Sequence, residues 1–454
     1  MNLKDKNVLV VGLGKSGFAS ALFLKKKGAN VIVNDIGDES KFIKERDILY
    51  KEGIKCVFGK HDKFLFYNQD LIVVSPGVPV NIEPFISAKN RGIEIIGELE
   101  LASRFISTPI IAITGTNGKT TTTTLLGEIL KEAGIKVFVG GNIGTPLIEY
   151  ADDDSADLVV LEVSSFQLET VYHFHPFGGI VLNITPDHLD RYSSMKEYAE
   201  TKMRLFERQE TFDFAVLNAD DQWIMRYKPS VLSDIFLFST EKEISKGAFY
   251  RDKKIYVRHP ILKDEVTIDE SEIRLKGIHN MENVMAVSIS ALELGVDLKV
   301  IKKVLYNFEG LHHRVEFVDE VNGVSFYNDS KGTNVGAVEK ALAGFDKSVV
   351  LILGGRDKSG GYSFLHKQIK RIVKHVIALG EAKDNIFRDL HEIVPVTKVN
   401  SFEEGVYTAF QKADKGDVVL LSPACSSFDM FNSYVERGEK FVEIVKKIKA
   451  EVNV

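Results

Sequence analysis

Short apolar runs recur along the chain, and most of them are followed by a glycine-bearing or polar segment and then by a helix-like pattern. Continuous apolar runs of this kind are typical of strands that are buried on both faces of a parallel sheet. Because the runs alternate with helical segments, the pattern predicts an α/β fold. The clearest runs lie at 7–11, 71–74, 110–113, 158–161, 180–182, 349–353, 376–379 and 418–421.

Two breaks divide the chain into three parts. Gly97-Glu98 separates a strand from a helical segment, and 308–316 looks like a hinge followed by a strand. A chain of 454 residues is expected to hold roughly two to four domains. We predict three domains, 1–97, 98–310 and 311–454, each an open, mostly parallel sheet with flanking helices. The outer two are expected to be Rossmann-like, and the central one is expected to be of the P-loop ATPase type.

The central part holds the strongest local signal. Strand 110–113 is followed by the loop 114–120, Thr-Gly-Thr-Asn-Gly-Lys-Thr, and a helical pattern begins behind it. Strand, glycine loop, Lys-Thr and helix form a cradle in which backbone N–H groups and Lys119 hold phosphates, and Thr120 or Thr121 offers a hydroxyl to Mg²⁺. Because position 113 is Ile, the spacing is shorter than in the common phosphate-loop motif. An ordinary strand-to-helix turn is the alternative.

The first part carries a second glycine turn. Residues 12–17 read Gly-Leu-Gly-Lys-Ser-Gly between a strand and a helix, and Asp35 ends the next strand. This matches the fingerprint of a nucleotide-diphosphate site, although glycines that serve only close helix–sheet packing would look the same. Ser75 follows the later strand 71–74 and is expected to share the crevice of this turn.

Three further strand ends of the central part carry polar residues, namely Asn142, Glu162 and His188. A carboxylate at a strand end across from a phosphate loop is the usual place of an acid that serves Mg²⁺. His188 alone would more often be structural, but the three positions together indicate function. Lys202 lies in the predicted helix 194–206, where periodicity indicates only a solvated lysine. Asn280 is expected either to cap a helix or to reach a base or ribose.

Composition narrows the classes of function. The net charge of -6 and the pI near 6.1 give no basic surface for nucleic acid. No apolar run approaches the ~18 residues of a membrane span, and the first residues lead straight into a strand, so we expect a cytoplasmic protein. Cys56 and Cys425 are too few for a disulfide scaffold, and Cys425 is expected to be a buried, inert thiol.

Taken together, the motifs resemble the Mur ligases, the cytoplasmic ATP-dependent enzymes that build the peptidoglycan stem peptide. The likeness extends over essentially the whole chain. Segments of the kind shared by the family are TGTNGKTT (114–121), EVSSFQL (162–168), NITPDHLDRY (183–192), HNMEN (279–283) and HHR (312–314). GLGKSG (12–17), NDSKGTN (328–334) and LSPACSSFDMF (421–431) favour a D-glutamate-adding member.

The resemblance implies the substrates UDP-N-acetylmuramoyl-L-alanine and D-glutamate, joined through an acyl phosphate at the expense of ATP. It places the reaction in peptidoglycan precursor synthesis and hence in cell shape and division, and we expect a monomer. Lys202 would carry a CO₂-derived carbamate, which is an oxygen ligand, whereas an ammonium repels Mg²⁺.

The same resemblance assigns roles to individual residues. ATP would be bound by Gly115, Thr116, Asn117, Gly118, Lys119, Thr120, Thr121, Asn280, Arg314 and Asp329. Two Mg²⁺ ions would be held by Thr120, Glu162, His188 and Lys202. The UDP-sugar would meet Lys15, Ser16, Asp35, Ser75, Asn142 and Gln167, and D-glutamate would meet Lys331, Thr333, Lys358, Ser427 and Tyr434. The catalytic set would be Lys119, His188, Lys202 and Asn142.

Two departures from the family pattern leave roles open. The roles of Arg356 and Asp357 are not assigned, and Ile36-Gly37 stand where polar residues would contact uracil. Three other functions compete. A dehydrogenase would explain GLGKSG and Asp35 but not the loop at 114–120. A folate polyglutamate-adding ligase would lack the first domain, and a regulatory nucleotide-binding protein would release no phosphate.

Overall fold

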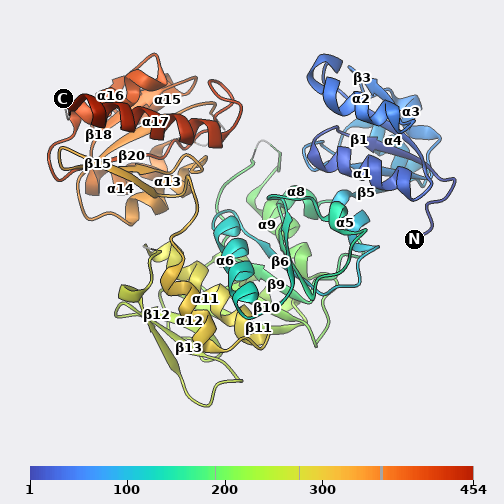
Figure 1. Cartoon of the computed structure of the whole chain (residues 1–454), viewed down its shortest axis with the longest axis horizontal. Coiled ribbons are helices and arrows are strands. Elements are labelled where there is room, and N and C mark those ends of the chain that lie inside the picture. The colour runs from blue at the N-terminus through green and yellow to red at the C-terminus, as the bar shows by residue number, and fades with distance from the viewer. Residues whose placement is uncertain (190, 276, 358–360, 453–454) are drawn as a thin grey trace.

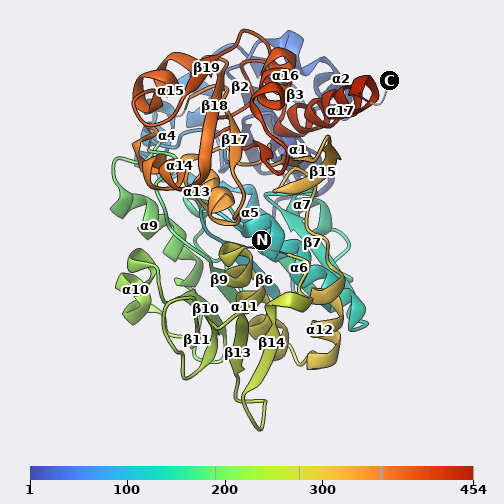
Figure 2. The same cartoon turned by 90° about the vertical axis from the view of Figure 1, so that its left-hand side faces the viewer.

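The computed structural model describes residues 1–189, 191–275, 277–357 and 361–452. Its strands form three separate sheets, taken from successive parts of the chain. Figures 1 and 2 show the first unit, in blue, and the last, in orange and red, on the same end of the central unit. The predicted fold class is confirmed, whereas the domain boundaries stay predictions.

The first sheet is parallel throughout, in the order β3-β2-β1-β4-β5. The chain order reverses beside β1, so the turn after β1 and Ser75 after β4 open toward one crevice at the carboxyl ends of the strands. The elements are β1 (Asn7–Val11), α1 (Lys15–Lys26), β2 (Asn30–Asp35), α2 (Ile43–Lys51), β3 (Lys55–Phe58), α3 (Lys63–Tyr67), β4 (Leu71–Val74), α4 (Glu83–Asn90) and β5 (Glu94–Gly97).

The central sheet has the order β14-β13-β12-β11-β10-β9-β6-β8-β7, and its last two strands, β13 and β14, are antiparallel to their neighbours. Its strands are β6 (Ile110–Thr114), β7 (Val137–Gly141), β8 (Leu158–Glu162), β9 (Gly178–Val181), β10 (Phe214–Asn218), β11 (Asp234–Ser239), β12 (Gly247–Arg251), β13 (Lys254–Arg258) and β14 (Val266–Asp269). Helix α5 (Glu98–Ser103) lies between the first sheet and this one in the chain. The helices of the central unit are α6 (Lys119–Glu132), α7 (Leu147–Tyr150), α8 (Ser165–Leu168), α9 (Met195–Met203), α10 (Gln222–Tyr227), α11 (Ile278–Glu293) and α12 (Leu298–Asn307).

The third sheet has the order β15-β16-β20-β17-β18-β19 and is parallel except for the edge strand β15. Its elements are β15 (Glu316–Val321), β16 (Val324–Asn328), α13 (Val335–Ala343), β17 (Val349–Gly354), α14 (His366–Ile372), β18 (Val373–Leu379), α15 (Lys383–Leu390), β19 (Val396–Lys398), α16 (Phe402–Lys412), β20 (Val418–Leu421) and α17 (Tyr434–Val452).

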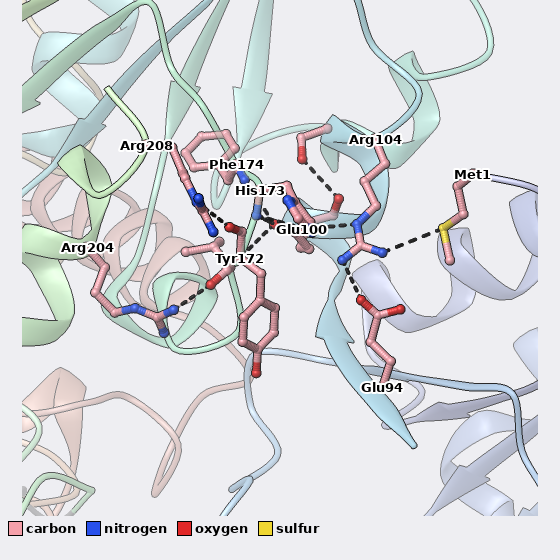
Figure 3. A network of polar contacts seen from close by, with 11 residues as sticks. Met1, Glu94, Glu100, Arg104, Tyr172, His173, Phe174, Arg204 and Arg208 are labelled. Carbon is pink, nitrogen blue, oxygen red and sulfur yellow. Dashed lines mark hydrogen bonds and ion pairs between the residues drawn. The ribbon is translucent and has the colours of Figure 1, made fainter. Parts of the chain in front are cut away.

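Helix α5 joins the first unit to the central one. The fully buried carboxylate of Glu100 accepts backbone N–H groups from Tyr172 at 2.8 Å and from His173 and Phe174 at 3.0 Å each, and Arg104 Nε at 2.8 Å (Figure 3). Arg104 also reaches Glu94 at the start of β5. A single carboxylate therefore fastens three consecutive backbone groups of the central unit to this connection.

Some local expectations need correction. The helix predicted over 194–206 ends at Met203 as α9, and a short 3₁₀ turn follows. Asn280 does not cap a helix, because α11 already begins at Ile278, with Gly277 as its N-cap. In the part of the chain described here, no helix is both long and apolar enough to cross a bilayer.

Candidate functional site

The loop between β6 and α6 has the backbone geometry of an anion cradle. Gly118 is the N-cap of α6 with a φ of 87°, a left-handed conformation that favours glycine. A Cβ at this position would lie 2.4 Å from Asn283 Oδ1, so glycine is also required for space. The N-terminus of α6 therefore has the backbone geometry of a phosphate cradle, and phosphate binding there stays a prediction.

Two lysines converge on one carbonyl of this loop. Lys119 Nζ donates to the Gly115 oxygen at 2.8 Å and to the Thr116 oxygen at 2.9 Å, and Lys202 Nζ donates to the Gly115 oxygen at 2.9 Å. Burial lowers the pKa of Lys119, and burial together with the nearby Lys119 lowers the pKa of Lys202 well below its ordinary value. Lys202 is therefore not a solvated lysine but a buried amine beside the loop, with Nζ 4.7 Å from the ring centroid of Tyr198.

Glu162 lies at the carboxyl end of β8 and is 2% exposed. Its Oε1 accepts a hydrogen bond from Asn142 Nδ2 at 2.7 Å, and its Oε2 is buried without a hydrogen-bond partner. An uncompensated buried carboxylate oxygen is costly, and a cation would compensate it. The described residues bring no three His, Cys, Asp or Glu side chains together as a metal cage. Mg²⁺ needs no such cage, because it is commonly held by one or two carboxylates, phosphates and water.

His188 stands at the same edge with a positive φ of 55°. Its ring packs against Phe166 with a centroid separation of 4.7 Å, and its Nε2 lies 3.7 Å from Asp187 Oδ2. The same Oδ2 accepts Asn334 Nδ2 from the third unit at 3.0 Å. The loop after β9 that carries Asp187 and His188 therefore contacts the third unit directly.

Arg314 makes a second contact between these units, because its Nη2 donates to Thr120 Oγ1 at 2.8 Å. A cavity of about 840 Å³ lies beside this contact and is lined by Thr120, Arg314, Lys331 and Tyr434, among others. Burial lowers the pKa of Lys331 to about 8, and its Nζ lies 3.8 Å from the ring centroid of Tyr434. Burial raises the pKa of Asp329 to about 7, although the Ser422 hydroxyl donates to it at 2.6 Å.

Among the predicted UDP residues of the first unit, one contacts the central unit and two bind the glycine turn itself. Lys15 Nζ donates to the Gly144 oxygen, two residues beyond Asn142. Asp35 accepts the backbone N–H groups of Leu13 and Gly37 at 2.7 Å each. Ser75 Oγ donates to the Gly12 oxygen at 2.7 Å. Asp35 and Ser75 thus shape the glycine turn, whatever else they bind.

The remaining predicted residues are spread over the three units. Ser16 lies in the first turn of α1, and Thr121 is buried in α6. Gln167 caps α8, since its Oε1 accepts the Ser164 N–H at 3.0 Å. Lys358 lies outside the described residues. Asn280, Thr333 and Ser427 lie respectively in the first turn of α11, just before α13, and buried in the loop after β20.

Two asparagines that the sequence analysis did not single out hold the phosphate loop. Asn183 accepts the Asn117 N–H through Oδ1 at 2.8 Å, and its own backbone oxygen accepts the Thr116 N–H at 2.8 Å. Asn283 accepts the Thr122 hydroxyl at 3.2 Å. Asn183 lies in the motif segment 183–192 and Asn283 in the segment 279–283, and this membership is the sequence signal that points to them.

Arg356 pairs with Glu381 on the surface, and Asp357 accepts Asn385 Nδ2 at 3.1 Å. Cys425 is fully buried beside the Tyr362 hydroxyl at 3.1 Å, and burial raises its pKa to about 12. The prediction of an inert thiol agrees with this setting, because the thiolate is the reactive form.

Comparison with known proteins gives matches in each unit. The family description "Mur ligase MurD-like, N-terminal domain" matches residues 6–97, "Mur ligase middle domain" matches 113–291, and "Mur ligase, glutamate ligase domain" matches 313–425. Two curated relatives named UDP-N-acetylmuramoylalanine--D-glutamate ligase come from Geotalea daltonii and Koribacter versatilis. They are 47% and 46% identical over 450 and 451 residues, with 99% of each chain covered.

Solved structures share the fold at lower identity. The UDP-N-acetylmuramate-alanine ligase MurC of Thermotoga maritima superimposes with a TM-score of 0.60 at 20% identity, covering 97% of this chain and 99% of that one. MurF of the same organism, crystallised with ADP, gives 0.60 at 17% identity, covering 99% and 96%. With family matches in all three units and full-length relatives at nearly half identity, the chain belongs to the Mur ligase family.

Proposed function

We propose that this protein is the ATP-dependent ligase that adds D-glutamate to UDP-N-acetylmuramoyl-L-alanine. The observation that carries the proposal is the convergence of the glycine loop of the central unit with Arg314 of the third unit at Thr120. The names of the full-length relatives support the same substrates. The ADP in the MurF crystal supports the nucleotide.

The reaction needs activation, because a carboxylate is a poor electrophile. ATP phosphorylates the carboxylate of UDP-N-acetylmuramoyl-L-alanine, and the bond from the γ-phosphorus to the bridging oxygen breaks to release ADP. The amine of D-glutamate then attacks the acyl phosphate, inorganic phosphate leaves and the amine loses a proton. In phosphoryl transfer a protein mainly positions groups and stabilises charge. Lys119, on leaving its loop carbonyls, and Arg314 supply positive charge at the loop.

The proposal places the first substrate on the glycine turn of the first unit, ATP on the loop of the central unit, and D-glutamate beside Lys331 and Tyr434 of the third. Asn142 stands between the first two, because its loop accepts Lys15 and its side chain donates to Glu162. Closing the units over the acyl phosphate excludes water, which would otherwise hydrolyse it. Ser427 belongs to the proposed D-glutamate site, for which the sequence also predicts Thr333 and Lys358.

Mg²⁺ fits the donor set, since the unpartnered Oε2 of Glu162 is an oxygen that a cation compensates. Thr120, Glu162, His188 and a modified Lys202 would hold two ions. When bound, Mg²⁺ neutralises the charge of the phosphate groups.

The burial of Lys202 supports the proposal of a carbamate on its side chain. The lowered pKa favours the uncharged amine, which is the form that is nucleophilic toward CO₂; addition gives a carbamate and releases one proton. We expect Lys202→Ala to lose about 100-fold in turnover, and added short-chain carboxylates to restore part of it. An inactive Lys202→Ala that no carboxylate rescues would argue against the modification.

The deciding experiment measures phosphate released from ATP as each substrate is added. We expect release to require both UDP-N-acetylmuramoyl-L-alanine and D-glutamate, with other amino acids inactive. Phosphate release that continues when one of the two substrates is left out would overturn the proposed ligase activity. Hydride transfer to a nicotinamide would indicate the dehydrogenase. We further propose a cytoplasmic monomer, to be checked by sedimentation and cell fractionation.

A further inference from the structure

An ion pair joins the central and third units away from the residues assigned to the reactants. Lys340 Nζ, from helix α13, lies 3.2 Å from Glu282 Oε2, from helix α11. The two side chains are 26% and 16% exposed, so the pair is less solvated than an ordinary surface ion pair. Neither residue touches the phosphate loop in a contact that the structure gives.

The charges around the pair favour a cation on the third unit and an acidic side chain on the central unit. Lys340 faces an acidic corner of the central unit, where it also lowers the pKa of Asp221 against the raising effect of burial. Burial raises the pKa of Glu282, Asp220 raises it further, and Lys340 and Asn218 oppose this shift. Glu282 therefore depends on a cation that the third unit brings to it.

Helix α13 is held at its beginning as well. Asn334 is its N-cap, accepting the Ala337 N–H at 2.8 Å, and it donates to Asp187 of the central unit at 3.0 Å. The polar segment 328–334, with Lys331 and Thr333, leads directly into this helix. On the other side, Glu282 lies two residues after Asn280, near the beginning of α11. The pair thus ties the helix behind the proposed D-glutamate segment to the helix that carries a proposed nucleotide residue.

We propose that Lys340 and Glu282 are a positioning pair that latches the third unit onto the central unit during the reaction. The pair keeps Lys331 in register with the phosphate loop and keeps water from the acyl phosphate. This inference rests on the proposed ligase function and deepens it. The latch is tested by the coupling of phosphate release to amide formation, since a closed enzyme releases one phosphate for each amide bond that it forms.

The test compares Lys340→Glu and Glu282→Gln with the unchanged enzyme. If Lys340→Glu reduces the closed population tenfold, the apparent KM for D-glutamate and for ATP rises about tenfold. Phosphate released per amide formed then rises above one, because water competes with the amine. Glu282→Gln changes both readouts in the same direction but less. A thermal midpoint equal to that of the unchanged enzyme shows that each variant is folded.

The charge swap Lys340→Glu/Glu282→Lys is the decisive variant. We expect it to recover most of the coupling, with Asp220 and Asp221 limiting full recovery. The matched control is the swap Lys398→Asp/Asp384→Lys, which exchanges an exposed pair 3.0 Å apart within the third unit and leaves coupling unchanged. Single variants that keep the unchanged enzyme's KM and one phosphate per amide would overturn the latch. If the unchanged enzyme itself released phosphate without D-glutamate, the proposed function would fail instead.

Discussion

The central unit meets its two neighbours in different ways. At the first joint, α5 runs into the central unit, and the buried Glu100 binds three consecutive backbone N–H groups there. At the second joint, the hydrogen bonds described above run from side chain to side chain, as between Arg314 and Thr120, and a cavity of about 840 Å³ lies beside them. Bonds from a buried charge to the backbone cannot exchange with water without a large loss, whereas side-chain pairs can separate and reform.

The difference indicates which joint is fixed and which one moves. A fixed first joint would hold the glycine turn that we propose for the UDP-sugar at a constant place relative to the phosphate loop. A separable second joint would admit the ATP and amino acid of the proposed reaction and then close over them. Changes at the first joint should therefore appear as lost stability, and changes at the second as lost activity or coupling.

The largest effect is expected at the first joint. Glu100→Ala leaves three backbone donors and Arg104 without their buried partner, which should destabilise the protein by about 3–5 kcal/mol. Denaturant unfolding measures this loss. Glu94→Ala is the matched control, since it removes the exposed partner of the same arginine and should cost about 0–1 kcal/mol. Equal losses in the two variants would contradict a fixed joint built on Glu100.

At the second joint, a change in the phosphate loop should reduce activity and not stability. Lys119→Ala removes the charge assigned to the phosphates, and we expect phosphate release to fall by about 10²–10³-fold. The unfolding midpoint should not fall, because the buried amine is itself costly. Lys131→Ala, at an exposed position in the last turn of the same helix, is the control and should keep full activity. Near-normal turnover in Lys119→Ala would remove the phosphate-loop argument.

The first joint also contains a buried carboxyl group, Glu98, that has fewer hydrogen-bond donors around it than Glu100. Glu98 accepts the Ile148 N–H at 2.7 Å, its other oxygen has no hydrogen-bond partner, and burial raises its pKa from 4.5 to about 7. The stability that it contributes is present below pH 4.5 and is lost as the pH rises through about 7. We expect Glu98→Gln to be more stable than the unchanged protein by about 1–3 kcal/mol at pH 8 and not at pH 4.5. Unfolding curves at both pH values decide the matter, and a pH-independent difference would rule out this titration.

The smallest effect is a shift in the pH profile at the second joint. The ionised form of Asp329 faces Arg314, so kcat/KM should fall as the pH drops through the Asp329 pKa of about 7. Ser422→Ala removes a hydroxyl that stabilises the ionised form and should move this acid limb upward by ~0.5–1 pH unit. An unmoved limb would show that another group sets it.

Much of this arrangement was predictable, because it depends on local patterns. Strands that end in glycine or polar residues gave the three sheets, and the loop at 114–120 gave the phosphate cradle. The antiparallel strands β13 and β14 were foreseen only as a charged, strand-like stretch. Strand direction depends on distant partners that alternation does not reveal.

The roles of single polar residues were harder to predict. Glu98 and Glu100 look like ordinary solvated acids of a short helix, yet both are buried, because the turn at 172–174 and the N-terminus of α7 pack onto them. The roles of Asn183 and Asn283 could not be predicted, because the sequence does not reveal which groups the side chain of an asparagine will bind. Lys202 was assigned by resemblance alone, and its burial is a tertiary property.

The shared carbonyl of Gly115 links two protonation equilibria. Lys119 and an unmodified Lys202 donate to the same oxygen, and the charge of Lys119 lowers the proton affinity of Lys202. A triphosphate that draws Lys119 outward relieves that repulsion, so nucleotide binding at constant pH is accompanied by proton uptake at Lys202. The heat of nucleotide binding should then vary with the ionisation enthalpy of the buffer, so calorimetry can detect the effect of this shared backbone oxygen.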